Sequence, residues 1–168
     1  FPEAQIVSHA MCRQLLDSVG RSGLEEAQAQ NQDLEEVQII LPELVFREGV
    51  LNLYLGGKTL QLHHMPGHSL DLIGVYVTNN QILFASDNSM PVPTIFDGSY
   101  KTLGASMHKM LELEPDTIVQ GHGEVILRGE VQSVVEHDLE YLTKIKDEVS
   151  KVLQSNQPVT ALDEIDIE

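Results

Sequence analysis

The fold of this chain is set by Met65-Pro66-Gly67-His68-Ser69, a short run in which a histidine follows a Pro-Gly turn. Two later runs have the same design, Phe84-Ala85-Ser86-Asp87 and Val119-Gln120-Gly121-His122-Gly123. In each, a side chain able to bind a metal ion comes just after an apolar run flanked by Gly or Pro, where a strand ends and a loop begins. Since 19 and 35 residues separate the histidine, the aspartate and the second histidine, only the folded chain can bring them together. Two imidazoles and a carboxylate suit zinc or a similar divalent ion.

The surrounding sequence predicts strands that alternate with helices. Apolar and β-branched runs predict strands at 4–9, 37–41, 44–47, 50–55, 58–64, 72–78, 82–85 and 117–119. Helices are predicted at 11–19, ending at Gly20, at 101–113, and along a long amphipathic stretch at 131–152. Strands that end in ligands and alternate with helices predict an α/β layered architecture with the site at one edge of the sheet.

Two stretches leave their interpretation open, a polar one and a loop with two prolines. Residues 21–36 are either a short helix at 24–30 with loops or a surface excursion, which could take part in substrate selection. Residues 90–100 are either the wall of a substrate pocket or a structural crossover held by its prolines. Within that second stretch, Asp97 and Tyr100 could contact substrate or cap the following helix.

Composition restricts the class of protein. A chain of 168 residues, 42% hydrophobic and 21% charged, indicates one soluble domain with a sizeable core. The formal net charge of -16 argues against nucleic acid and anionic membranes as partners. No apolar run approaches the roughly 20 residues of a bilayer span, and the single Cys12 rules out an internal disulfide. We therefore expect a small-molecule substrate and a location in the cytoplasm rather than the periplasm or outside the cell.

Taken together, the three runs resemble the second half of a metallo-β-lactamase-fold hydrolase. The likeness extends from about Ala4 to about Val149 and is carried by Pro66-Gly67-His68-Ser69, Leu83-Phe84-Ala85-Ser86-Asp87 and Gly121-His122-Gly123, in the family's order. The resemblance implies an αβ/βα sandwich, of which this chain covers mainly the second half. We assign residues 1–153 to this partial domain and residues 154–168 to an acidic C-terminal tail.

The family resemblance also implies the roles of the site residues. His68 would complete a first metal site, His122 would hold a second metal, and Asp87 would bridge the two and orient the nucleophile as a catalytic residue. The metals would be two Zn²⁺ ions in the complete enzyme, with Fe or Mn as alternatives. Such ions lower the pKa of bound water and polarise the substrate, so the implied reaction is hydrolysis of an ester, thioester, lactone or amide-like bond.

One departure from the family pattern is equally informative. The leading signature, His-x-His-x-Asp-His, supplies the other metal ligands in complete members and does not occur in this sequence. The chain opens with Phe rather than Met, so we expect a native start and an N-terminal half to be missing. On this interpretation the chain is inactive alone. The alternative is a non-catalytic half-domain that acts as a binding or self-assembly module, with homo-oligomers formed through an uncovered sheet face.

The remaining histidines are expected to play lesser roles. His9 ends a strand near the site but matches no ligand of the family. His63 and His64 point to opposite faces of one strand, so they cannot replace a His-x-His pair, although they could orient a ligand. His108 and His137 lie in predicted helices and are expected at the surface or in packing.

Overall fold

The computed structural model describes residues 3–155, 158, 160 and 162, and the acidic run 163–168 of the predicted tail lies outside them. A five-stranded sheet has the order β3 (Val50–Leu55), β4 (Lys58–His64), β5 (Ile73–Val77), β6 (Ile82–Ser86) and β7 (Thr117–Gln120). A parallel pair, β1 (Val7–His9) and β2 (Leu44–Phe46), forms a second, small sheet. The helices are α1 (Ala10–Leu15), α2 (Arg21–Gln30), α3 (Tyr100–Glu112) and α4 (Val131–Gln154), with a π-helical turn at Leu16–Gly20 and a 3-10 turn at Gln32–Leu34.

Turn chemistry and strand direction explain the topology of the large sheet. Gly56 and Gly57 join β3 to β4 with φ of 56° and 76°, the left-handed backbone that a two-residue hairpin requires. The pairs β3–β4, β4–β5 and β5–β6 are antiparallel. Strands β6 and β7 are parallel, because α3 carries the chain back between them as a crossover. Strands β4, β6 and β7 therefore run in the same direction and end at the same edge of the sheet.

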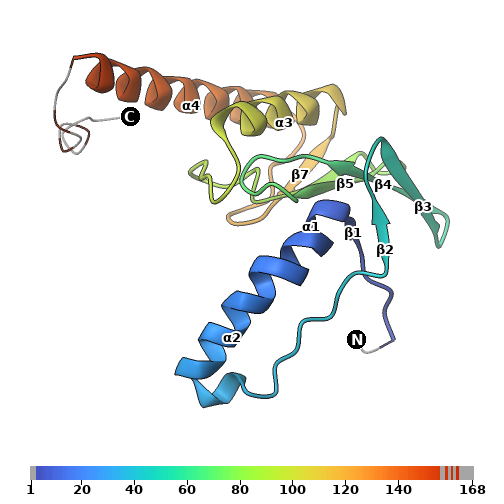
Figure 1. Cartoon of the computed structure of the whole chain (residues 1–168). Helices are drawn as coiled ribbons and strands as arrows, with labels where there is room; N and C mark the ends of the chain where they lie inside the picture. The colour runs from blue at the N-terminus through green and yellow to red at the C-terminus, as the bar shows by residue number, and fades with distance from the viewer. Residues whose placement is uncertain (1–2, 156–157, 159, 161, 163–168) are drawn as a thin grey trace.

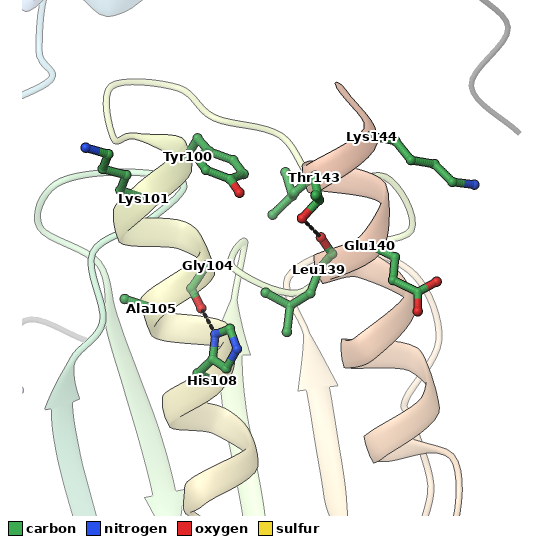
Figure 2. Close-up of a pocket in the computed structure, with 10 residues that line it drawn as sticks. Tyr100, Lys101, Gly104, Ala105, His108, Leu139, Glu140, Thr143 and Lys144 are labelled. Carbon is green, nitrogen blue, oxygen red and sulfur yellow. Dashed lines mark hydrogen bonds between the residues drawn. The ribbon is translucent and has the colours of Figure 1, made fainter. Parts of the chain in front are cut away.

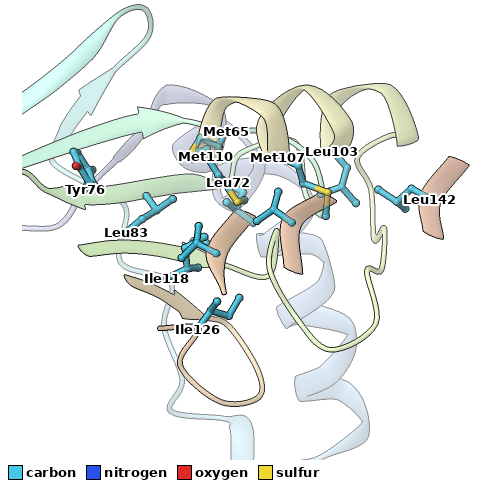
Figure 3. Packing of buried hydrophobic residues seen from close by; sticks show 13 residues of the cluster. Met65, Leu72, Tyr76, Leu83, Leu103, Met107, Met110, Ile118, Ile126 and Leu142 are labelled. Carbon is cyan, nitrogen blue, oxygen red and sulfur yellow. The ribbon is translucent and has the colours of Figure 1, made fainter. Parts of the chain in front are cut away.

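The core lies between this sheet and α3 and α4, which lie side by side on one side of it (Figures 1 and 3). On α3, Leu103, Met107 and Met110 recur at helical spacing and are at most 1% exposed. They pack in one cluster with Leu83 of β6 and Ile118 of β7. Burying a Leu, Met or Ile side chain contributes about 1.5–3 kcal/mol, so these contacts anchor α3 to the strands that lead into the site.

The other face of the sheet is apolar as well. The strand register places Leu60, Val77 and Ile82 in one row across the sheet, and Val75 beside Phe84 in the next. We call these five residues the open sheet face. Phe84 is 46% exposed and the other four are partly exposed. Helices α3 and α4 lie on the opposite side of the sheet, and α2 projects away from it (Figure 1).

Most predicted elements are present, but two predictions were wrong. The predicted strand at 37–41 is a loop and pairs with no strand among the described residues. The start of this segment is held by the Gln28 side chain of α2, whose Nε2 donates to Leu34 O at 2.9 Å and to Val37 O at 3.1 Å. The first helix does not end at Gly20, whose φ of -61° and ψ of -43° are helical, so the chain continues through the π-helical turn into α2. The polar stretch 21–36 therefore contains a helix longer than the one predicted at 24–30. In the part of the chain that is described, no helix has the length and hydrophobicity needed to span a bilayer.

Candidate metal centre

The three residues singled out by the sequence lie at one edge of the large sheet. His68 is in the turn after β4, Asp87 follows β6 directly, and His122 follows β7 by two residues. Because these strands run in the same direction and end at the same edge, their following loops converge. The structure thus brings together three side chains that are far apart in the sequence.

Asp87 lies between the two histidines. His68 Nε2 is 3.7 Å from Asp87 Oδ2, and His122 Nε2 is 3.7 Å from Asp87 Oδ1. These separations are too long for direct hydrogen bonds, and each imidazole faces a different oxygen of the carboxylate. The His68 side chain is 20% exposed, that of Asp87 32% and that of His122 70%. The second histidine therefore sits at the solvent-facing side of the cluster.

This arrangement is two His–Asp pairs that share a carboxylate, rather than a closed three-ligand site. Among the described residues, no group of three or more His, Cys, Asp and Glu side chains is placed so that it could hold one metal ion. Catalytic zinc usually has three protein ligands and an open position. The two pairs fit a metal centre in donor chemistry, but each supplies at most two donors to an ion.

The orientation of the His68 ring is fixed by the loop before α3. Its Nδ1 lies 2.9 Å from Thr94 O, and because a carbonyl oxygen can only accept, Nδ1 carries the proton. Nε2 then lies on the side of Asp87. Metal-binding histidines usually donate their other N–H to a carbonyl or carboxylate in this way. The His68 carbonyl is held too, since Phe96 N donates to it at 2.8 Å and Gly98 N at 3.3 Å.

Backbone conformation directs Asp87 and His122. A β-bulge lies between Phe84 and Ser86, and Ser86 has a φ of +50°, which turns the chain out of the strand just before Asp87. Gly121 N donates to Ser86 O at 2.9 Å. A Cβ at Gly121 would collide with Asp87 Oδ1, so only glycine allows the His122 loop to approach this closely.

The loop before α3 is both a structural crossover and an exposed apolar rim. Asp97 Oδ1 accepts from Leu70 N at 2.9 Å, so Asp97 ties the loop to the His68 turn rather than capping α3. The cap is Ser99, and Tyr100 is the first residue of the helix. Val92 is 57% and Phe96 80% exposed, with the Phe96 ring centroid 6.3 Å from that of His68.

A groove of about 650 Å³ lies elsewhere, between α3 and α4 (Figure 2). Its walls include Tyr100, Gly104 and His108 on α3, and Leu139 and Thr143 on α4. None of the three candidate residues lines it. The candidate centre and this groove are therefore separate features of the molecule.

His9 and His64 are packing residues. Their rings stack at 3.6 Å between centroids with 7° between planes. His9 Nε2 donates to Arg47 O at 3.0 Å while its Nδ1 accepts from Met11 N at 3.3 Å, which caps α1. His64 Nε2 donates to Leu70 O at 2.9 Å. Burial lowers the pKa of His64, and the hydrogen bond to Leu70 partly offsets this effect.

The remaining titratable candidates also lie outside the cluster. His63 is 4% exposed, and neither ring nitrogen has a hydrogen-bond partner among the described residues; burial lowers its pKa. His108, an exposed residue of α3, donates from Nδ1 to Gly104 O at 2.7 Å. Cys12 is half-buried, and burial first, then Asp71, raises the pKa of its thiol, which disfavours the reactive thiolate.

Comparison with known proteins identifies the superfamily to which the chain belongs. The family model of the metallo-beta-lactamase superfamily matches residues 1–122, and the chain belongs to that superfamily. A beta-lactamase-like protein 2 homolog of Caenorhabditis elegans is 30% identical over 108 residues, which are 64% of this chain and 36% of that protein. The chain thus spans about a third of the curated relative it matches.

Solved structures confirm the predicted α/β fold of metallo-β-lactamase type. A metallo-beta-lactamase family protein of Thermus thermophilus matches with a TM-score of 0.66 at 16% identity, over 89% of this chain and 56% of its own. A metallo-beta-lactamase of Pontibacter korlensis matches with a TM-score of 0.61 at 18% identity, over 84% and 59%. Members of this superfamily are commonly hydrolases that bind zinc.

Proposed function

We propose that this chain forms part of a metal-dependent hydrolase whose centre is built around Asp87. His68 and His122 are the ligands on either side of it, and the complete protein holds two divalent ions, zinc in the first place and iron or manganese as alternatives. The observation that carries the proposal is that each imidazole Nε2 faces a different oxygen of one carboxylate, at 3.7 Å in both cases. A carboxylate that bridges two ions needs such neighbours.

The surroundings of the three residues support a ligand role. His68 has its Nδ1 proton held by Thr94 O, so its Nε2 is free to bind a cation. Gly121 leaves room for Asp87 where any other residue would collide with the carboxylate. Each pair supplies only two donors to an ion. We therefore propose that the remaining ligands come from residues of the natural full-length protein other than those of this chain.

The chemistry follows from this set. Bound metal ions would supply a water of lowered pKa and polarise the scissile bond of the substrate. Asp87 would accept a hydrogen bond from the attacking water at one oxygen and so orient it. His68, with its ring fixed by Thr94, would keep its Nε2 in a constant direction. We propose an ester, thioester, lactone or amide-like bond in a small molecule as the substrate class.

The test uses the natural full-length protein with His68→Ala, His122→Ala and the control His108→Ala. His108 is an exposed histidine on α3, away from the cluster. We expect both cluster variants to lower zinc per molecule and hydrolysis of an ester and thioester panel together, by roughly tenfold or more. His108→Ala should match the unchanged protein. Normal zinc content and turnover in both cluster variants would refute the ligand assignment.

A second candidate is a non-catalytic module that assembles through the open sheet face. The observation that favours this candidate is that Phe84 is 46% exposed although its strand, β6, lies between two other strands of the sheet. Large exposed apolar patches commonly mark association sites. Light scattering separates the candidates, since a monomer over a wide concentration range would exclude self-assembly.

A further inference from the structure

Asn88, the residue after Asp87, is a polar side chain in an almost fully buried position, 1% exposed. Both ends of its amide are used. Oδ1 accepts from His68 N at 2.8 Å, and Nδ2 donates to Met65 O at 2.5 Å. The side chain thus satisfies two backbone groups of the turn that carries His68, from the loop that carries Asp87.

The fit between Asn88 and that turn is close. A Cβ at Gly67 would lie 2.5 Å from Asn88 Oδ1 and 2.8 Å from Leu103 Cδ1, so the turn can settle against the amide only because it contains glycine there. On the other side of the turn, Ser106 Oγ donates to Pro66 O at 2.8 Å. The turn is therefore clamped between the amide and α3.

The His122 loop is held by different atoms. Gly121 N donates to Ser86 O at 2.9 Å and to Ser89 O at 3.1 Å. Ser89 Oγ also donates to Gln120 Oε1 at 3.3 Å. These bonds come from the same loop, but none of them uses the side chain of Asn88.

We infer that Asn88 is a positioning residue that sets the place of His68 relative to Asp87 and leaves His122 unaffected. The inference rests on the proposed function in that it takes His68 and Asp87 as ligands. Asn88 is covalently joined to Asp87 and hydrogen-bonded to the His68 amide, so it is the shortest connection between the two. Removing the amide leaves His68 N and Met65 O without this partner and lets the turn move.

The test compares Asn88→Ala and Asn88→Asp with the control Asn52→Ala in the natural full-length protein. Asn52 is an exposed asparagine on β3, so Asn52→Ala removes the same amide group as Asn88→Ala at a position outside the site. Asn88→Asp keeps the acceptor for His68 N and loses the donor to Met65 O, which gives a second variant should the alanine variant fold poorly. The probe is Zn²⁺ alone, and the readouts are zinc affinity and the ring NMR signals of His68 and His122, assigned by their alanine variants.

In zinc-free protein, we expect both Asn88 variants to shift or broaden the His68 ring signal while the His122 signal keeps its place. Zinc affinity should fall by about 10–100-fold, with the zinc-induced shift weakened at His68 first. General destabilisation would disturb both rings equally, and that result overturns the positioning role, as does an unchanged His68 signal. If the unchanged protein shows no response to Zn²⁺, the proposed metal centre fails, and the zinc-free His68 signal alone then decides the role of Asn88.

Discussion

Ser86 is the residue whose backbone directs Asp87 into the site. Its φ of +50° lies in the left-handed region, which costs a residue with a Cβ roughly 1–2 kcal/mol. Its side chain is exposed, so the conformation is imposed by the bulge and by the bonds that its carbonyl accepts. Strain of this kind persists only where the surrounding structure fixes it.

We therefore predict that Ser86→Gly raises the free energy of unfolding by about 0.5–1 kcal/mol, because glycine adopts this φ without the Cβ penalty. Ser86→Val should lower it by about 1–3 kcal/mol, because a β-branched residue is especially disfavoured there. Urea denaturation measures both changes. A glycine variant less stable than the unchanged chain would show that the Ser86 side chain contributes something that its exposed position does not reveal.

Asp138 on α4 gives a prediction about pH. It is 6% exposed, and burial, partly offset by His137, raises its pKa from 3.8 to about 6. Between these two values the folded chain holds a proton that the unfolded chain has lost, so stability falls as pH rises through this window. Asp138→Asn should remove this loss and raise stability at pH 7 by roughly 1–3 kcal/mol.

Thermal unfolding at pH 4 and pH 7 measures the effect. Relative to pH 4, stability at pH 7 should be higher in Asp138→Asn than in the unchanged chain. Glu140→Gln, on an outward position of the same helix, is the control and should leave the difference as it is. An equal pH response in Asp138→Asn would show that this carboxyl is already ionised in the folded chain.

At the scale of the element, α3 links the core to the candidate centre. Its N-terminus follows the loop that fixes His68, and its cap is a reciprocal pair: Thr102 N donates to Ser99 Oγ, and Ser99 N to Thr102 Oγ1, both at 3.1 Å. We predict that Ser99→Ala lowers the free energy of unfolding by about 1 kcal/mol. Ser133→Ala, which removes an exposed hydroxyl near the start of α4, should change it by less than about 0.5 kcal/mol. Equal losses in the two variants would contradict the assigned cap.

The elements that could be predicted from sequence are those with a strong local signal. The bounds of β3 and β4 follow from alternating residues around Gly56-Gly57. The segment at 37–41 has the apolar residues of a strand but lies against α2 through Gln28, a tertiary contact that no local pattern contains. Gly20 suggested a helix end because glycine favours left-handed backbone, yet its backbone stays helical.

For the candidate site, the sequence predicted that three residues would lie close together, but not the contacts that hold them. His68, Asp87 and His122 each follow a strand, and parallel strand direction brings them to one edge. The residues that hold them were not predictable, because Asn88 and Thr94 form their hydrogen bonds to His68 across 20 and 26 positions of the chain. Only the fold defines such contacts.

At the scale of the whole molecule, the open sheet face is the surface through which we propose that the second candidate function would act. Its apolar side chains continue across β4, β5 and β6, and the opposite face is packed under α3 and α4. Burial of these apolar side chains would favour association of two copies. The net charge of -16 on each copy would oppose that association, most strongly at low salt.

We predict that Phe84→Asp lowers self-association of the chain, whereas Tyr54→Asp does not. Tyr54 is 77% exposed on the other face of edge strand β3, so it controls for the loss of an exposed aromatic and the gain of a charge. Sedimentation velocity at several concentrations gives the association state. Equal association in the Phe84 variant and the unchanged chain would exclude this face as the contact.

The most direct test of the metal centre is a crystal structure of the natural full-length protein grown with zinc and measured above and below the zinc absorption edge. The proposal predicts anomalous density bonded to Asp87, with His68 Nε2 and His122 Nε2 each at about 2.0–2.1 Å from a zinc ion. Anomalous density elsewhere, with these three side chains bound to no ion, would contradict it.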